Sequence, residues 1–599
     1  MDRKSIVILA VCFGLLLLWP QLVKKMYPPK PRTAGDTNLT TVVYGTNGST
    51  AAPAAPVAPP VLMPATTPVL PFEPTAPEQT EVVETEHARY VFTSHGGGLK
   101  RVELVQYPET VSRKRKAAPT LNNVAELNAQ VSVPVLALLG DASFQEDGVF
   151  TLTPIPRGVR AEKNLTNGLR VVKQFEVGTN YLVHATVRLE NTGATPLALP
   201  AQEWVIGTAT PMNPKDDGSR VGLMWYNGSK KEEILGLWFD NRTLGCLPGT
   251  PRSEYRAGTS NVVWAAAQNQ FFALAAMPAE PVLQVVARPV QLPRPPADEV
   301  PANRRNGPPP RGFQTAFVYP ELRLAPGEAR EREIHFFAGP KEYRTLARLA
   351  IQFQNNVDLV MGFSGFFGFF SKGLLLSMNW LHDALKLSYG LAIIAITFII
   401  KLLFWPLTQA STRSMKRMAA LQPQMKALQE KYKDDPAKMN KKLMEFMREH
   451  KVSPLGGCLP MLLQMPVFIG FFYMIKSAIE LRGASFLWVA DLSQPDTLFF
   501  IPGLNFPFNL LPLLMGATML WQSHMTPPSP SMDPMQQKMM RYMPLMFLLF
   551  LYNFSAGLTL YWTVQNLLSI AQMKLTKSTE PASGAAPGAA PGLPPKKRK

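Results

Sequence analysis

Cysteine and charge are both scarce in this chain. Its 599 residues include only three cysteines, Cys12, Cys246 and Cys458, and no two of them form a C-x-x-C pair. This pattern argues against a disulfide framework and against a thiolate metal site. Charged residues make up 17% of the chain, against about 25% in a typical soluble protein. A single compact soluble domain is therefore not expected.

The sequence also lacks the motifs of common enzyme classes. It has no Gly-Lys dipeptide for a P-loop and no H-E-x-x-H, and His382, His450 and His524 are scattered. The long apolar segments contain no Asp or Glu, which a secondary transporter normally carries for ion coupling. We therefore expect no enzyme, no catalytic residues, and neither a metal nor another cofactor.

Residues 1–27 are predicted to be a transmembrane anchor. The 19 residues from Ser5 to Val23 are mostly apolar and follow Arg3 and Lys4, and as a helix they just span a hydrocarbon core of about 30 Å. The alternatives are a cleaved signal peptide and a lipoprotein signal ending at Cys12. Neither fits well, because no Ala-x-Ala site follows and a small residue does not precede Cys12.

A linker and a β domain are predicted next. Nine of the thirty residues from Ala51 to Thr80 are proline, so residues 28–80 should form an extended linker. Residues 81–345 contain short alternating runs such as Ala88–Thr93, Tyr181–Leu189 and Glu333–Phe337, separated by Gly, Pro and Asn. This pattern predicts an exported antiparallel β-sandwich of roughly 250 residues.

Residues 387–575 are predicted to form a helical membrane core. Its apolar stretches are Tyr389–Leu407, Leu455–Ile475, Leu498–Trp521 and Tyr542–Met573. The last stretch has 32 residues and is interrupted by Asn553, Ser555 and Gly557. Two crossings of about 15 residues would each be about 23 Å long and would require a locally thinned bilayer.

Charge decides the predicted topology. Residues 409–456 carry eleven Lys and Arg against five Asp and Glu, so this loop should be cytoplasmic. If the N-terminus lies in the cytoplasm and the β domain is exported, the chain must cross the membrane once between the β domain and this cytoplasmic loop. We therefore expect residues 360–386, which are apolar but contain Lys372 and Asn379, to form an amphipathic helix at the outer interface. The result is a polytopic α-helical protein with six transmembrane helices, five of them in the core, and both termini in the cytoplasm.

Residues 410–451 are predicted to form a cytoplasmic hairpin of two amphipathic helices. The first runs from Met415 to Tyr432, and the second starts at Pro436 after the capping residue Asp435. Methionines recur along the hairpin at positions Met415, Met418, Met425, Met444 and Met447. They either pack only against the partner helix or offer an adaptable surface to the apolar segments of substrates.

Lys401 is the strongest functional signal in the apolar segments. It has no carboxylate partner in them, and Thr397 lies one helical turn before it on the same face. A cation in a membrane span costs at least about 2.5 kcal/mol and by default marks a functional site facing a wet cavity. The alternative is a lysine that snorkels to the cytoplasmic end of its helix. Gln464, Gln522, Gln565 and Asn566 are further polar residues at depth, which either complete a hydrophilic concavity or join helices.

Four segments resemble the YidC/Oxa/Alb family of membrane-protein insertases, in the Gram-negative form with a large periplasmic domain. They are Thr397–Lys401 with Pro406–Thr408, Val452–Pro466, Asp533–Lys538 and Ser555–Trp562. The resemblance is close over residues 385–575, and the Pro-Leu-Gly-Gly-Cys stretch that ends at Cys458 makes it specific. The β domain resembles the family's β-supersandwich.

The resemblance implies an insertase and chaperone that inserts, folds and assembles integral membrane proteins without a nucleotide, alone or with the Sec translocon and its accessory subunits. It places the chain in the bacterial inner membrane with the β domain in the periplasm. It also implies a groove, open to the cytoplasm and to lipid, that receives nascent membrane proteins. Lys401 stands where the family usually has arginine, and Thr397, Gln464, Tyr561 and Trp562 match positions on or beside the groove, to which we add Asn566.

The C-terminal tail, residues 576–599, is predicted to be disordered and ends in Lys596–Lys599. These cations either contact ribosomal RNA or anionic lipid or act only as a topology signal. For the β domain, a role as a plain scaffold that binds envelope partners also stays open.

Overall fold

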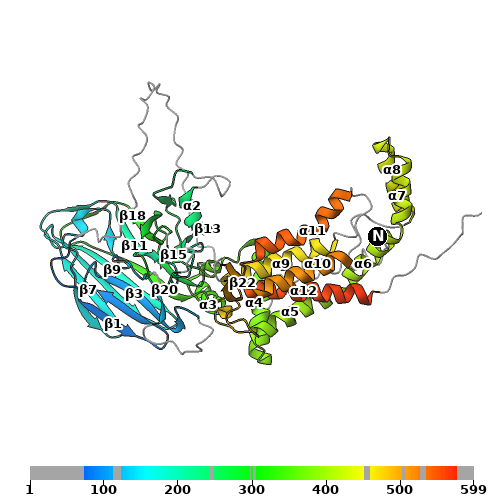
Figure 1. Ribbon diagram of the computed structural model, residues 1–599. Coiled ribbons are helices and arrows are strands. Elements are labelled where there is room, and N and C mark those ends of the chain that lie inside the picture. Colours follow the sequence, from blue (N-terminus) through cyan, green and yellow to red (C-terminus); the bar gives the residue numbers. More distant parts are fainter. Residues whose placement is uncertain are drawn as a thin grey trace, which may run out of the picture. The chain divides into compact units, whose positions relative to one another are not determined.

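The computed structural model describes residues 73–111, 123–241, 249–296, 299–300, 305, 307–450, 459–501, 506–525 and 534–576. The predicted anchor, the linker up to residue 72, the tail from residue 577 and all three cysteines lie outside these residues. Figure 1 shows a β-rich part, coloured blue to green, and a helical part, coloured green to red.

The largest element of the β-rich part is an antiparallel sheet of nine strands. Its order is β13-β12-β15-β16-β20-β9-β8-β7-β6. The strands are β6 (Thr151–Ile155), β7 (Gly158–Asn164), β8 (Leu169–Val177), β9 (Leu182–Asn191), β12 (Gly222–Tyr226), β13 (Lys231–Leu235), β15 (Trp264–Gln268), β16 (Phe272–Pro278) and β20 (Ala329–Pro340).

Two smaller sheets pack against the nine-stranded sheet. Their orders are β14-β17-β18-β11-β5 and β1-β2-β3-β4, and β10 pairs with β19. The strands are β1 (Thr80–Glu84), β2 (Arg89–Thr93), β3 (Gly98–Pro108), β4 (Val124–Leu127), β5 (Leu138–Leu139), β10 (Leu197–Leu199), β11 (Gln202–Ala209), β14 (Tyr255–Ala257), β17 (Gln284–Gln291), β18 (Arg311–Tyr319) and β19 (Leu322–Leu324). Strand β11 contacts β15 and β16, and β1 contacts β6 and β7, so the sheets form two layers. The prediction of an antiparallel β domain is confirmed.

The alternation of apolar and polar residues along the strands explains why one face of the large sheet is buried. In β9, Val183, Ala185 and Val187 are buried, whereas the residues between them are polar and partly exposed. Aromatic rings fill the space between the layers: Phe92 of β2 lies 5.1 Å from Phe175 of β8. The buried face therefore supplies the core, and the other face of the sheet carries polar side chains.

The helical part begins after β20. Its first elements are α3 (Tyr343–Phe353), η3 (Val357–Met361), α4 (Gly365–Leu385) and α5 (Tyr389–Leu403). Helix α4 occupies most of the predicted interfacial segment, residues 360–386. Among the described residues, no helix alone combines the length and apolar character of a membrane crossing; α4 and α5 reach it only as a pair, bent by 118°.

The remaining helices are α6 (Trp405–Ala420), α7 (Gln422–Lys431), α8 (Pro436–Glu449), α9 (Leu459–Ser477), α10 (Leu510–Met525), α11 (Pro534–Leu551) and α12 (Ala556–Leu575). The expected interruption of the last apolar stretch is present, because α11 ends at Leu551 and α12 begins at Ala556. The expected length of about 15 residues is wrong, since α11 has 18 residues and α12 has 20.

Two segments expected to be helical differ in the structure. The helix expected from Met415 to Tyr432 is broken at Leu421, because Pro423 in the first turn of α7 has no N–H to donate to the preceding turn. The stretch Leu498–Trp521 begins with a hairpin of β21 (Thr497–Ile501) and β22 (Phe506–Asn509), and the helix starts only at Leu510. Phenylalanines suit a strand, and Pro507 removes a backbone donor.

Candidate functional site

Helix α5 turns a polar face toward α12. Thr397 is fully buried, and its hydroxyl donates to the carbonyl oxygen of Ile393 at 2.7 Å. Lys401, one turn later, is only 7% exposed, and its Nζ donates to Oγ of Ser569 on α12 at 2.8 Å. Phe398 and Leu402 of the same helix are about half exposed, at 49% and 51%. The ammonium of Lys401 thus points between helices, while the apolar side chains face outward.

The local sequence explains where α5 begins and ends. Ser388 caps the N-terminus by accepting from the N–H of Leu391 at 3.5 Å. At the other end Phe404 separates α5 from α6, where Pro406 occupies the first turn. Lys401 therefore lies in the last turn of α5, where a cation is favoured by the helix dipole.

Helix α12 presents a polar stripe to its neighbours. The stripe consists of Tyr561, Gln565, Ser569 and Gln572, whose spacing of three or four residues places them on one face. Helix α12 contacts α5, α9 and α10. Each stripe residue bonds to a polar group of another helix, so the stripe links helices that are otherwise packed by apolar contacts.

A chain of hydrogen bonds connects α12 with α9. Gln565 Nε2 donates to Oε1 of Gln464 at 2.9 Å, and Nε2 of Gln464 donates to the hydroxyl of Tyr561 at 2.7 Å. The ring of Tyr561 stacks on Phe471, with the centroids 4.2 Å apart. Gln464 and Tyr561, both predicted site residues, are thus brought together.

Ser569 and Gln572 continue the same arrangement. The Ser569 hydroxyl donates to the carbonyl oxygen of Gln565 at 2.8 Å, so its oxygen is available to accept from Lys401. Gln572 Nε2 donates to Oγ1 of Thr408, on α6, at 2.6 Å. The polar stripe therefore runs past Lys401 toward α6, which leads into the hairpin.

The positive charge of Lys401 is not balanced by a carboxylate on the helices around it. Helices α5, α9, α10 and α12 contain no Asp or Glu, and the other lysines on them, Lys476 and Lys574, lie in their last turns. Lys401 is therefore a fixed positive charge that faces hydrogen-bonding groups and no carboxylate of these helices. Such a charge attracts an anionic group.

Two predicted groove residues lie apart from this cluster. Asn566 Nδ2 donates to Oγ1 of Thr518 at 3.1 Å and joins α12 to α10. Trp562 packs edge-on against Phe468, with the centroids 4.5 Å apart. The structure thus places Lys401, Gln464 and Tyr561 along one side of α12, and Thr397 lies one turn before Lys401 on the same face of α5. Asn566 and Trp562 have other partners.

The methionines of the hairpin fall into two groups. Met425 and Met447 are buried in one cluster with Leu421 and Leu443, and Met418 is also buried. Met415 is half-buried, and Met444 is 58% exposed. The N-terminus of α8 is capped by Asp435, whose Oδ1 accepts from the N–H of Lys438 at 3.0 Å.

Sequence reasoning missed Ser569, Gln572 and Thr518 as partners in this site. The signal for two of them was present, because polar residues recur every three or four positions from Tyr561 to Gln572 in an otherwise apolar run. Thr518 has no such pattern around it and follows only from the helix packing.

Comparisons with known proteins cover most of the chain and agree with one another. The model of the "60Kd inner membrane protein" family matches residues 380–582, and that of the "YidC periplasmic domain" matches residues 81–376. The membrane protein insertase YidC of Syntrophus aciditrophicus is 30% identical over 587 aligned positions, which cover 96% of this chain and 98% of the relative. The YidC of Bordetella pertussis is 31% identical over 606 aligned positions, with coverages of 98% and 99%.

Several solved structures are also similar, and one of them is a YidC insertase. It is described as an active YidC insertase with the first transmembrane domain resolved, and it covers 85% of this chain and 96% of its own, at 19% identity and a TM-score of 0.33. The family assignment rests on the full-length relatives and on the two family models. The chain belongs to the YidC family of membrane protein insertases.

Proposed function

We propose that this chain inserts membrane proteins into the bacterial inner membrane and that Lys401 attracts the polar tail of the arriving substrate. The observation that carries the proposal is the buried ammonium of Lys401, which points at the polar stripe of α12 and has no carboxylate on the surrounding helices. This arrangement lies beside apolar surface that suits lipid, such as Phe398 and Leu402.

The physical task of an insertase is to lower a desolvation barrier. Moving a polar tail through hydrocarbon is costly, because its hydrogen-bonding groups lose water without gaining partners. In the proposed groove, the partly exposed amide of Gln464 offers replacement partners, the buried Thr397 and Tyr561 lie behind it, and Lys401 adds an attractive charge. No nucleotide, cofactor or catalytic residue is needed, since the apolar segment of the substrate gains free energy on entering the bilayer.

The lengths of α5 and α10 support a thinned membrane around this groove, whereas α12, with 20 residues, is long enough to span a typical hydrocarbon core. Helix α5 has 15 residues and α10 has 16, which correspond to about 22 and 24 Å at about 1.5 Å per residue, against a hydrocarbon core of about 30 Å. A bilayer that adapts to such helices becomes locally thinner. The polar tail then crosses a shorter barrier.

The hairpin of α7 and α8 is the proposed first contact for apolar segments of the substrate. Met444 is the exposed methionine of the predicted set, and its flexible thioether side chain adapts to varied partners. Met415 is half-buried. Met425 and Met447 are buried in the hairpin cluster, and we assign them to holding the hairpin surface in place. Met418 is buried on the adjoining helix α6.

The proposed topology has six transmembrane helices, five of them in the core, and α4 lies along the outer interface. Both termini are cytoplasmic, and the β domain is periplasmic. The excess of Lys and Arg in residues 409–456 supports a cytoplasmic hairpin. Proposed partners are nascent membrane proteins, the lipid bilayer, the Sec translocon with its accessory subunits, and the ribosome through the basic tail and the cytoplasmic loops.

The test is reconstitution of the purified chain in liposomes with a single-span substrate that carries a short acidic tail. Protease protection of the tail measures insertion. We expect the wild type to insert the substrate well above empty liposomes, and Lys401→Glu to insert it at least about tenfold less, which equals about 1.4 kcal/mol. Lys386→Glu is the matched control, because Lys386 is an exposed residue at the end of α4.

The possible results distinguish the insertase function from the role of Lys401. If the wild type does not exceed empty liposomes, the insertase proposal is wrong. If Lys401→Glu and Lys386→Glu both behave like the wild type, insertion stands and the role of Lys401 does not.

A further inference from the structure

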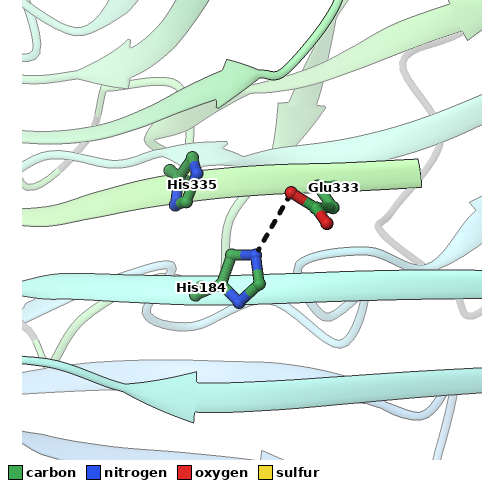
Figure 2. A group of neighbouring side chains, drawn as sticks. All are labelled: His184, Glu333 and His335. Carbon is green, nitrogen blue, oxygen red and sulfur yellow. Dashed lines mark ion pairs between the residues drawn. The ribbon is translucent and has the colours of Figure 1, made fainter. Parts of the chain in front are cut away.

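Two histidines and a glutamate converge on the polar face of the nine-stranded sheet. His184 of β9 and His335 of β20 are paired directly opposite each other, and Glu333 precedes His335 by two residues on the same face. Figure 2 shows the three side chains gathered on these neighbouring strands. One potential ligand atom from each residue lies within 4.8 Å of the other two.

The contacts of these side chains leave their ligand atoms largely uncommitted. His184 Nε2 lies 3.8 Å from Oε2 of Glu333, as the dashed line in Figure 2 marks. The Nδ1 atom of His335 is buried and has no hydrogen-bond partner among the described residues. A buried ring nitrogen without a partner is unusual in a folded protein, and a bound cation would satisfy it.

The surroundings hold the ring of His335 in place. The ring of His335 packs between His184, 4.8 Å away, and Phe353 of α3, 4.6 Å away, measured between centroids. The neighbouring Arg188 pairs with Glu190 and Glu331, so it does not neutralise Glu333. The side chain of Glu333 is 53% exposed, which leaves the site open to solvent on one side.

We propose that His184, Glu333 and His335 bind one Zn²⁺ ion, with solvent as the fourth ligand. Two imidazole nitrogens and one carboxylate are a ligand set that zinc commonly uses when one position stays open. Zinc–ligand distances of about 2.0–2.2 Å place tetrahedral ligand atoms about 3.4 Å apart. Rotation of the exposed carboxylate and of the half-buried His184 closes the present spacing. Mg²⁺ and Ca²⁺ prefer oxygen ligands and are disfavoured.

The site has a structural consequence. It would tie β9 to β20 at the centre of the sheet, directly before the chain leaves the sheet for α3. Because a ligand that binds only the folded state stabilises it, Zn²⁺ should raise the melting temperature of the β-rich part.

The experiment measures Zn²⁺ binding to the purified full chain, prepared without a polyhistidine tag, by competition with a chromogenic chelator. We expect one Zn²⁺ per chain, and binding at least about tenfold weaker in Glu333→Gln and in His184→Gln. Co²⁺ should give the visible spectrum of a four-coordinate site. His95→Gln is the control, because His95 lies in the same β-rich part and contacts the carbonyl oxygen of Ala76 instead.

The possible results either support or overturn the proposed zinc site. A melting curve in chelator verifies that every variant is folded, and Glu333→Gln, at an exposed position, is the variant least able to disturb the sheet. Loss of the site in the Glu333 and His184 variants with retention in His95→Gln supports it. No stoichiometric Zn²⁺ in the wild type, or an equal loss in His95→Gln, overturns it.

Discussion

At the residue scale, Tyr561 completes the hydrogen-bond chain that joins α12 to α9. Its hydroxyl accepts from Nε2 of Gln464, whose Oε1 accepts from Gln565. Among helices packed in a membrane, such bonds contribute on average about 0.6 kcal/mol and at most about 1.7 kcal/mol. The chain therefore adds to the alignment of the helices around Lys401 without dominating their stability.

Tyr561→Phe should lower the melting temperature of the purified protein in detergent, because Nε2 of Gln464 loses its acceptor while the ring packing on Phe471 is kept. Tyr473→Phe is the matched control, since Tyr473 lies on α9, the helix that carries Gln464, and is 45% exposed. Equal melting temperatures for Tyr561→Phe and the wild type would show that the chain of bonds adds no stability.

Lys173 of β8 is a buried lysine in the β-rich part. Its Nζ donates to the carbonyl oxygen of Gly96 at 2.6 Å and lies 4.4 Å from the ring centroid of Phe150. Burial lowers the pKa of Lys173 to about 7, whereas an unfolded lysine has a pKa of about 10.4. Between these values the unfolded chain binds more protons than the folded chain, so the free energy of unfolding should increase as pH rises from about 7 to about 10.

Lys173→Met should flatten this pH dependence, because it removes the titrating amine. Thermal melting at about pH 7 and about pH 9 measures the effect as the difference in melting temperature. The buried Lys341, whose pKa burial also lowers to about 7, contributes in both proteins and leaves a residual slope. Identical slopes in the variant and the wild type would contradict the assignment to Lys173.

The sequence predicts single residues best where charge is conspicuous. Lys401 and Thr397 stand out because a cation and a hydroxyl share one face of an apolar helix. Ser569 does not, since serine is common in helices and its role depends on the packing of α12 on α5. His184 and His335 are far apart in the sequence and meet only through the pairing of β9 with β20. No local pattern marks that pairing.

At the element scale, the hairpin of α7 and α8 contains both buried methionines, which stabilise it, and an exposed methionine. Met425 is fully buried in the hairpin cluster, whereas Met444 is 58% exposed. Met425→Ala should destabilise the hairpin by about 2–5 kcal/mol, the usual cost of truncating a buried methionine. Hydrogen exchange in residues 422–449 should accelerate in this variant.

Met444→Ala is the matched variant and should leave hydrogen exchange in the hairpin unchanged. If Met444 contacts substrates, the same change should reduce photo-crosslinking between the hairpin and the apolar segment of an arriving chain. Faster exchange in Met444→Ala than in Met425→Ala would reverse the assignment.

Elements could be predicted where periodicity is clear. Alternation along Ala88–Thr93, Tyr181–Leu189 and Glu333–Phe337 correctly predicts β2, β9 and part of β20. The run from Leu498 has no such signal, because a continuous apolar stretch suits either a strand or a helix. The break at Leu421 follows from Pro423. The sequence pattern did not predict it, because methionines recur at helical spacing on both sides of the break.

At the scale of the whole molecule, the helix lengths predict how activity depends on the bilayer. Since α5 and α10 are shorter than a typical hydrocarbon core, insertion should be fastest in thin membranes. The measurement compares liposomes of dimyristoleoyl, dioleoyl and dierucoyl phosphatidylcholine under otherwise equal conditions. We expect insertion to fall in that order, and a rate independent of thickness would rule out thinning as a contribution.

The most direct measurement of the role of Lys401 reverses the charge of the substrate tail and the charge at position 401. Two single-span substrates that differ only in an acidic or a basic tail are inserted by the wild type and by Lys401→Glu in the same liposomes. We predict that the wild type prefers the acidic tail and that Lys401→Glu prefers the basic one, because the attraction depends on the sign of both charges. The same preference in both proteins would contradict an electrostatic role for Lys401.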